Sequence, residues 1–369
     1  MPVLTAVTMN QGELYMNKYW SRLAAGVDPY VPGEQPRDRK YIKLNTNESP
    51  YGPSPMVLKA LREAADESLK LYPDPTCDML VNAAAESYGL KKEQIFAGNG
   101  SDEVLAFSFM AFFDPGRTIV FPNITYSFYP VYASLFKLDF VTTPLDSELN
   151  IPSEKLMQSS GGIIIANPNA PTGKALQLSK IREVLEGNPD VVVIVDEAYI
   201  DYGGETAVGL IKDYPNLLVI QTFSKSRALA GMRIGFAFGD SELIKALESI
   251  KNSFNSYTLD RLAIVAGTAA LNDPAYYGMT TAKVVATRER FTRELRKRGF
   301  TVADSAANFV FASHCSLRGG DIFTALRERG ILVRYFKKPV IENYLRISMG
   351  TDEEMDTVIR ALDEILKGN

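Results

Sequence analysis

The sequence contains very few of the residues on which several common kinds of protein depend. Its 369 residues include only two cysteines, Cys77 and Cys315, and one histidine, His314. Two distant thiols give neither a disulfide framework nor a set of zinc ligands, so we predict no metal site. A Ser-His-Asp or Cys-His enzyme would have to use His314, and the Gly-x-Ser-x-Gly motif is missing. The expected acid–base groups are therefore lysine, tyrosine or a carboxylate.

Long apolar runs and clusters of positive charge are also missing. No stretch approaches the roughly 20 apolar residues that a membrane-spanning helix needs. The formal net charge is −4, and no long run of lysine or arginine appears. We therefore expect neither nucleic acid nor a membrane as a partner. The first eight residues do not resemble a secretory signal, and with so few cysteines we expect a cytoplasmic protein.

The sequence is otherwise that of a globular protein, in which apolar runs alternate with helical patterns. The runs lack the period-two alternation of half-exposed strands, which indicates strands that are buried on both faces. The predicted fold class is α/β, with a mostly parallel central sheet flanked by helices. The strands are expected at residues 94–97, 118–121, 140–142, 162–165, 191–195, 217–220 and 234–238.

The pattern changes after about residue 270. A long charged helix is expected at 282–298, followed by mixed strands and helices that indicate a smaller α+β domain. We predict an N-terminal arm at 1–40, a large domain at 56–270, and a small domain made of 41–55 and 271–369. The arm is rich in aromatic residues, namely Tyr15, Tyr19, Trp20 and Tyr30.

Lys225 follows the apolar run 217–220, where a buried strand is expected to end. In open α/β sheets, ligands bind at the carboxyl ends of the strands. A lysine amine walled by apolar residues is poorly solvated, which disfavours its ammonium form and makes it a usable nucleophile. Ser224 and Arg233 could hold the phosphate of a ligand whose aldehyde reaches Lys225. The alternative is a solvent-facing lysine in a loop.

Other strand ends carry polar groups that suit the same ligand. A buried carboxylate such as Asp196 is costly unless it is paired, and a pyridinium nitrogen is one suitable partner. Tyr199 could bind a phenolate oxygen of the same ring, and Tyr126 could stack on its face. The glycine-rich turn at 98–103 opens a helix, which suits phosphate. Together these groups match pyridoxal 5′-phosphate.

Each of these residues also has an ordinary structural explanation. Asp196 could cap a helix, Tyr199 and Tyr126 could be core aromatics, and the turn could bind nothing. The turn also resembles half of a dinucleotide fingerprint, but Glu103 stands at the third glycine position, which argues against a nicotinamide cofactor.

The motifs that carry these residues resemble those of the fold-type-I pyridoxal-phosphate aminotransferases, and within them the histidinol-phosphate aminotransferases. The resemblance runs along nearly the whole chain. It includes the segments Tyr30–Pro36, Leu44–Pro55, Tyr72–Pro75, Gly98–Glu103, Asp196–Tyr199, Phe223–Ser226, Ala230–Gly235 and Leu345–Gly350.

The resemblance implies a role for each matching residue. Lys225 would bond to the cofactor aldehyde and move a proton during the reaction, with Asp196 keeping the ring nitrogen protonated. Tyr199 would bind the ring oxygen O3′, and Tyr126 would stack on the ring. The phosphate would be held by Ser101, Asp102, Ser224 and Arg233, and by Tyr72 of a neighbouring subunit, which implies a homodimer.

The resemblance further implies transamination between L-histidinol phosphate and 2-oxoglutarate, giving imidazole-acetol phosphate and L-glutamate, in histidine biosynthesis. Arg346 matches an arginine that binds a substrate carboxylate, an interaction worth about 1.5–3 kcal/mol. Arg334 is expected to be a second anion site, and Tyr30 and Asn47 are expected to bind substrate. An aromatic amino acid aminotransferase and a threonine-phosphate decarboxylase are the alternatives with the same cofactor. A cofactor-binding regulator is disfavoured because the chain has no basic patch.

One position departs from the family pattern. Most members have an asparagine immediately before Pro-Thr-Gly, where it binds O3′, but this chain has Ala170. Either Asn169 substitutes for it from a shifted backbone, or Tyr199 holds O3′ without it. We include Asn169 among the predicted cofactor-binding residues.

Overall fold

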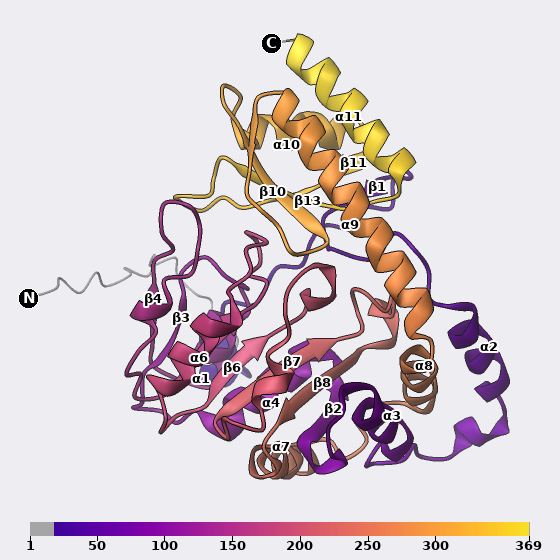
Figure 1. The fold of residues 1–369 in the computed structure, drawn as a ribbon, viewed down its shortest axis with the longest axis vertical. Helices are drawn as coiled ribbons and strands as arrows, with labels where there is room; N and C mark the ends of the chain where they lie inside the picture. Colours follow the sequence, from indigo (N-terminus) through magenta and orange to yellow (C-terminus); the bar gives the residue numbers. More distant parts are fainter. Residues whose placement is uncertain (1–17, 369) are drawn as a thin grey trace, which may run out of the picture.

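The computed structural model describes residues 18–368 and consists of a large and a small lobe (Figure 1). Residues 1–17 of the predicted arm, with Tyr15, lie outside the described part. Within it, no helix is both long and apolar enough to cross a membrane. The lobes are joined by the long helix α9 (Pro274–Lys297), which passes from one to the other. Tyr277 near its start packs in the large core, and Phe291 and Leu295 pack in the small one.

The large lobe is built on a seven-stranded sheet with the order β2-β8-β7-β6-β5-β3-β4. All neighbouring pairs are parallel except the two that involve β8, which runs antiparallel to β7 and β2. The predicted mostly parallel α/β sheet is therefore confirmed. The strands are β2 (Ile95–Asn99), β3 (Ile119–Pro122), β4 (Phe140–Thr143), β5 (Gly162–Ala166), β6 (Val193–Asp196), β7 (Leu217–Thr222) and β8 (Ile234–Gly239).

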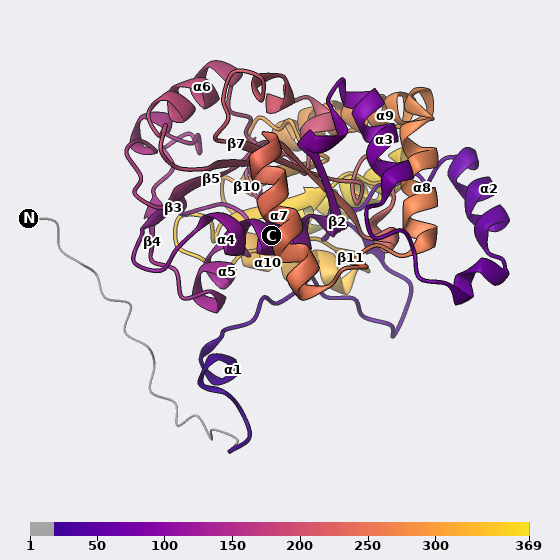
Figure 2. The ribbon, with the colours of Figure 1, turned by 90° about the horizontal axis from the view of Figure 1, so that it is seen from below.

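Successive side chains of the central strands alternate between two apolar cores. Ile163 and Ile165 pack into one core, and Ile164 between them packs into the other. This is the geometry of a strand covered on both faces, and it explains the continuous apolar runs in the sequence. Helices α4 (Gly100–Phe112), α5 (Tyr129–Leu135) and α7 (Ser241–Phe254) cover one face, and α3 (Asp78–Tyr88), α6 (Leu178–Glu186) and α8 (Arg261–Leu271) cover the other (Figure 2).

The small lobe contains a four-stranded antiparallel sheet with the order β12-β13-β10-β9. Its strands are β9 (Phe300–Val302), β10 (Phe309–His314), β12 (Arg334–Tyr335) and β13 (Tyr344–Ser348), and it packs with α10 (Gly319–Glu328) and α11 (Asp352–Lys367). The early strand β1 (Ile42–Lys43) pairs in parallel with β11 (Ile331–Leu332), which brings the segment after residue 41 to this lobe. The predicted domain boundaries stay a prediction.

The predicted helix at 282–298 differs in extent from the one observed. The helix expected at 282–298 begins earlier, because Asp273 caps it by accepting a hydrogen bond from the Tyr276 N–H, and Pro274 suits its first turn. Before the large sheet, α2 (Pro55–Ala64) ends and is followed by a separate 3₁₀ turn, Glu67–Lys70, which Asp66 caps. The remaining short helices are α1 (Arg22–Gly26) and the 3₁₀ turns Lys92–Gln94, Ser153–Lys155, Ile200–Tyr202, Ala207–Leu210 and Ala230–Met232.

Candidate active site

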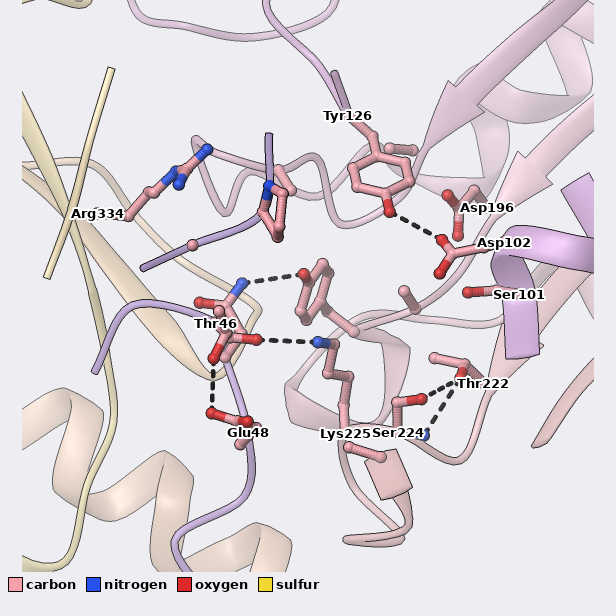
Figure 3. Close-up of a pocket in the computed structure, with 18 of the residues that line it drawn as sticks. Thr46, Glu48, Ser101, Asp102, Tyr126, Asp196, Thr222, Ser224, Lys225 and Arg334 are labelled. Carbon is pink, nitrogen blue, oxygen red and sulfur yellow. Dashed lines mark hydrogen bonds between the residues drawn. The ribbon is translucent and has the colours of Figure 1, made fainter. Parts of the chain in front are cut away.

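A cavity lies at the carboxyl ends of β6 and β7, where the small lobe and the segment around residue 46 meet the large lobe (Figure 3). Most of the predicted site residues line it, and they come from segments that are far apart in the chain. These residues are Tyr30, Asn47, Ser101, Asp102, Tyr126, Asp196, Tyr199, Ser224, Lys225, Arg233, Arg334 and Arg346. Among residues 18–368, no three His, Cys, Asp or Glu side chains are grouped so that they could hold a metal ion.

Lys225 stands in the turn after β7, and its side chain extends into the cavity (Figure 3). Its Nζ donates a hydrogen bond to the carbonyl oxygen of Thr46 at 3.1 Å and lies 5.8 Å from the centre of the Tyr199 ring. Thr46 belongs to the segment that follows β1, so a lysine of the large lobe touches a segment held by the small one. The amine is therefore positioned from both sides of the cavity.

Asp196, the last residue of β6, is only 5% exposed, and its two carboxylate oxygens have different surroundings. Oδ2 accepts a hydrogen bond of 2.8 Å from the hydroxyl of Tyr129, whereas Oδ1 is buried and has no hydrogen-bond partner in the described chain. Burial raises the pKa of Asp196 to about 6, although the Tyr129 hydroxyl acts in the opposite direction. An unpaired buried acceptor suits a ligand that brings its own N–H donor.

The turn between β2 and α4 forms a narrow cradle. Gly100 has φ +76°, which favours glycine, and its backbone is approached closely by Gly235 of β8. A Cβ at Gly235 would lie only 2.5 Å from the backbone nitrogen of Ser101. The first N–H groups of α4 have no partner within the helix and carry the positive end of its dipole, so this cradle suits an anion.

Polar side chains surround the cradle. Arg233 lies 3.1 Å from Asp102 (Nη2 to Oδ2) and 3.4 Å from Ser224 (Nη1 to Oγ). The hydroxyl of Tyr126 donates to the other Asp102 oxygen at 2.8 Å. Burial raises the pKa of Tyr126 well above its ordinary value, so the phenol stays protonated and remains a donor. Asp102 thus holds both a tyrosine ring and a guanidinium at the edge of the cavity.

Tyr199 is held by Asn47. The Asn47 amide nitrogen donates to the Tyr199 hydroxyl oxygen at 2.9 Å, which leaves the phenolic proton free for another acceptor. Asn47 has φ 59°, and Ser348 of β13 donates to its side-chain oxygen at 2.8 Å. The Asn308 amide nitrogen donates a further hydrogen bond, to the backbone carbonyl oxygen of Asn47 at 2.9 Å. These bonds fix Asn47 from the small lobe.

Asn169 is not brought together with the other predicted residues. Its amide nitrogen donates to the carbonyl of Ile124 at 2.9 Å and to the Thr172 hydroxyl at 3.2 Å, and its side chain does not line the cavity. Ala170 does line it. The geometry therefore favours the second alternative, in which Tyr199 acts without an asparagine at that point.

Two arginines form the small-lobe wall. Arg346 of β13 donates to the carbonyl of Asn45 at 2.9 Å, and its Nε is buried without a partner in the described chain. Burial lowers the pKa of Arg346. Arg334 of β12 donates to the carbonyl of Val31 at 3.3 Å, next to Tyr30, whose ring stacks on Phe128 at 4.5 Å. This wall can receive an anionic ligand.

Tyr72 does not line the cavity of its own chain. It is 78% exposed and stacks on the exposed Tyr257, with 4.7 Å between ring centres. Its predicted contact with a phosphate in a neighbouring subunit stays a prediction.

The sequence prediction missed several residues that shape the cavity. Thr46 binds Lys225, and Thr222 lies 3.0 Å from Ser224 between hydroxyl oxygens. Glu48 lines the cavity and pairs with Lys43. Tyr129 was missed although it lies three residues after Tyr126 on the same short segment, and the need of a buried carboxylate for a donor was the signal that could have identified it.

The chain is similar to known proteins along most of its length. Residues 39–362 match the family model described as aminotransferase class I and II. The chain is 55% identical to a histidinol-phosphate aminotransferase of Clostridium acetobutylicum, over 95% of this chain and 100% of the relative. It is 54% identical to one from Clostridium beijerinckii, over 96% and 99% of the two chains.

Solved structures with the same fold include a histidinol-phosphate aminotransferase from Sinorhizobium meliloti in complex with pyridoxal-5′-phosphate. The TM-score is 0.83 at 26% identity, covering 89% of this chain and 92% of that one. An L-threonine-O-3-phosphate decarboxylase from Porphyromonas gingivalis has a TM-score of 0.77 at 22% identity, covering 88% and 99%. This second likeness shows the fold alone.

Proposed function

This chain belongs to the class I and II aminotransferases, and from that premise we propose that it transfers an amino group between L-histidinol phosphate and 2-oxoglutarate, in histidine biosynthesis. The family membership predicted from the sequence motifs is confirmed. The observation that carries the substrate assignment is the 55% identity, over 95% of this chain, to a histidinol-phosphate aminotransferase. The decarboxylase and the aromatic aminotransferase have no comparable support.

Pyridoxal 5′-phosphate is the cofactor that we propose, because the residues of the cavity fit its chemical groups. The unpaired Oδ1 of Asp196 suits the ring nitrogen, and the cradle closed by Gly235 suits the phosphate. When bound, this cofactor supplies an aldehyde that takes up the substrate amino group and a ring that accepts the electrons of the broken Cα–H bond. We assign its phosphate to Ser101, Asp102, Ser224 and Arg233, the first two through backbone N–H groups.

The chain's own residues position the ring and move the proton. Lys225 Nζ, in its neutral form, has a lone pair that can take the proton from the substrate Cα and return it. Ionised Asp196 favours a protonated ring nitrogen, and Tyr199 can direct its free phenolic proton at the ring oxygen. Tyr126 provides a ring surface beside the same space.

Both proposed substrates are anions, which is consistent with the two arginines of the small-lobe wall. Arg346 has a buried Nε and is anchored to Asn45, so we assign it to the group that is nearest the reacting carbon. Arg334 lies beside Tyr30 and suits the other end of the substrate. Tyr30 and Asn47 complete the proposed substrate contacts.

We also propose a homodimer in which Tyr72 reaches the partner's phosphate site. The support is a group of exposed apolar side chains: Tyr72 stacks on Tyr257, and Leu69, Leu71 and Phe254 lie close to these two residues in the sequence. Such clusters mark interfaces more often than free surfaces. The unpaired thiols Cys77 and Cys315 are consistent with the cytoplasm as the proposed compartment.

A visible absorption spectrum tests the proposed function. The purified protein should carry the band of lysine-bound pyridoxal phosphate, and L-histidinol phosphate without any keto acid should convert it to the pyridoxamine form. Lys225→Ala should bind the cofactor without that covalent band. A band that responds only to phenylalanine or threonine phosphate would refute the substrate, and no band after adding cofactor would refute the proposal as a whole.

A further inference from the structure

A tyrosine that does not line the cavity, Tyr129, donates a hydrogen bond to Asp196, which does line it. Asp196 points toward the site from the end of β6 (Figure 3). One of its oxygens, Oδ2, accepts the hydroxyl proton of Tyr129 at 2.8 Å, while Oδ1 has no partner in the part of the chain that the structure describes. A carboxylate tethered by one oxygen cannot rotate freely, so Oδ1 is the oxygen that remains for a ligand.

Tyr129 is built as a fixed donor. It is the first residue of α5 and is fully buried, with its ring packed edge-on against Phe121 at 5.8 Å and Tyr126 at 5.7 Å. Burial raises the pKa of Tyr129 well above its ordinary value, so its phenol stays protonated. Its single proton is committed to Asp196, and the packed ring cannot turn it elsewhere.

We propose that Tyr129 is a positioning residue for the amino-transfer reaction, which orients Asp196 and keeps it ionised so that Oδ1 can hold the proton of the cofactor ring nitrogen. The inference rests on the proposed function, because it requires a pyridine ring in the cavity. Tyr129 does not line the cavity, so its effect on the ring would pass entirely through the carboxylate.

The charges around Asp196 show why this donor matters. Burial is the largest influence on Asp196 and raises its pKa, and the neighbouring Asp102 raises it further. The Tyr129 hydrogen bond lowers the pKa most, and the backbone N–H of Ala198 and the positive charge of Lys225 also lower it. Without the Tyr129 hydroxyl, Asp196 would take up a proton at a higher pH. A protonated carboxyl no longer favours a proton on the ring nitrogen.

The test compares Tyr129→Phe with Tyr132→Phe in the cofactor-loaded protein. Tyr132 is a matched control, because it is a buried tyrosine of the same helix whose hydroxyl donates to the backbone carbonyl of Asp102 at 2.8 Å. The readouts are the pH midpoint of the visible cofactor band and the ¹⁵N chemical shift of labelled pyridoxal phosphate. A ring with less positive charge holds the proton of its lysine linkage more tightly, so the band midpoint should rise in Tyr129→Phe.

We expect the Tyr129→Phe midpoint to rise by about one pH unit and its ring ¹⁵N signal to move toward neutral pyridine, with Tyr132→Phe unchanged. The kcat should fall roughly tenfold while the KM for L-histidinol phosphate stays the same. If Tyr129→Phe does not fold, 3-fluorotyrosine at residue 129 keeps the ring and is a stronger donor, so it should move the midpoint slightly downward.

An unchanged midpoint and ¹⁵N signal in Tyr129→Phe, or equal shifts in both variants, would overturn the inference. Absence of the band in the unmodified protein would instead overturn the proposed function, so the two failures are distinguishable. A fall in kcat with an unmoved midpoint would show that Tyr129 acts only through packing, which also contradicts the proposal.

Discussion

Asp196 and Glu197 are adjacent buried carboxylates at the end of β6. Their hydrogen bonds differ, and this difference indicates that Asp196 faces a ligand whereas Glu197 has a structural role. Asp196 leaves one oxygen unpaired beside the cavity. Glu197 has donors on both oxygens: the Ala207 N–H at 2.6 Å on Oε1, and the Thr206 hydroxyl at 2.6 Å and Gln221 amide at 2.8 Å on Oε2. Glu197 therefore ties β6 to β7 and to the turn after residue 206.

Glu197 should make the stability of the cofactor-free protein depend on pH. Burial raises the pKa of Glu197 to about 7, above its value in an unfolded chain. The folded state then binds more protons between about pH 4.5 and 7, so this group's contribution to the free energy of unfolding falls as pH rises through that window. Glu197→Gln removes this titration. The free energy of unfolding of the variant, relative to that of the wild type, should therefore rise by about 1–3 kcal/mol from pH 5 to pH 8.

Urea unfolding of both proteins at pH 5 and pH 8 measures this gain. Glu197→Gln also loses an accepted hydrogen bond. This loss lowers the free energy of unfolding of the variant equally at pH 5 and pH 8, so it does not affect the change between the two pH values. Glu205→Gln, at an exposed position nearby, serves as the control and should show no such change. If the free energies of unfolding of Glu197→Gln and wild type differed by the same amount at pH 5 and pH 8, the expected linkage would be contradicted.

At this scale the sequence predicts side chains that stand at strand ends better than it predicts contacts. Lys225, Asp196 and Ser101 could be found because apolar runs end beside them. The hydrogen-bond partners of the site residues could not be predicted, because they are distant in the sequence. Asn47 and Tyr199 are 152 positions apart, and Tyr129 and Asp196 are 67 positions apart. Asn169 was chosen by sequence position, but its backbone turns its amide toward Ile124.

Among the elements, the positions of the large-sheet strands were predicted closely, but the reversed direction of β8 was not predicted. Buried parallel strands produce continuous apolar runs, and the observed strands lie within a few residues of the expected ones. The reversal of β8 does not appear in such a run. Its signal is the connection 223–233, which contains only a 3₁₀ turn and no crossover helix of the kind that parallel neighbours need.

The contact between β8 and the start of α4 should be essential for cofactor binding. A Cβ at Gly235 would meet the Gly100 carbonyl carbon at 2.4 Å and the Ser101 nitrogen at 2.5 Å. Gly235→Ala must therefore push the helix N-terminus away from β8. We expect the Kd for pyridoxal phosphate to rise more than tenfold, since a hydrogen bond to a charged group contributes about 1.5–3 kcal/mol.

Gly231→Ala, in the 3₁₀ turn just before β8, is a matched control, because a Cβ there would meet nothing within 4 Å. Cofactor titration of the two variants, followed by fluorescence, gives the comparison. Similar affinities for Gly235→Ala and Gly231→Ala would show that the cradle does not depend on this close approach.

For the molecule as a whole, the segment around residues 45–48 links the lobes at the cavity. Arg346 of the small lobe donates to the Asn45 carbonyl, and Lys225 of the large lobe donates to that of Thr46. A displacement of one lobe would therefore disturb the groups that hold the substrate and the reacting amine together. Residues 41–55 were predicted to belong to the small domain, and the pairing of β1 with β11 is a physical reason for that association.

The proposed homodimer makes a prediction that only the assembled molecule can answer. If Tyr72 serves the partner's site, a hybrid dimer of one Lys225→Ala subunit and one Tyr72→Phe subunit contains one fully wild-type site. That site combines Lys225 of the second subunit with Tyr72 of the first. The Tyr72→Phe homodimer should bind cofactor roughly tenfold more weakly, and the Lys225→Ala homodimer should be inactive.

Hybrids carrying two different affinity tags can be purified and assayed at limiting pyridoxal phosphate. We expect about half of the wild-type activity per dimer, because one of the two sites is restored. If Tyr72 acted within its own subunit, the hybrid's only lysine-bearing site would also carry the Tyr72→Phe defect. Its activity would then stay at or below that of the Tyr72→Phe homodimer, and the exposed stack of Tyr72 on Tyr257 would need another explanation.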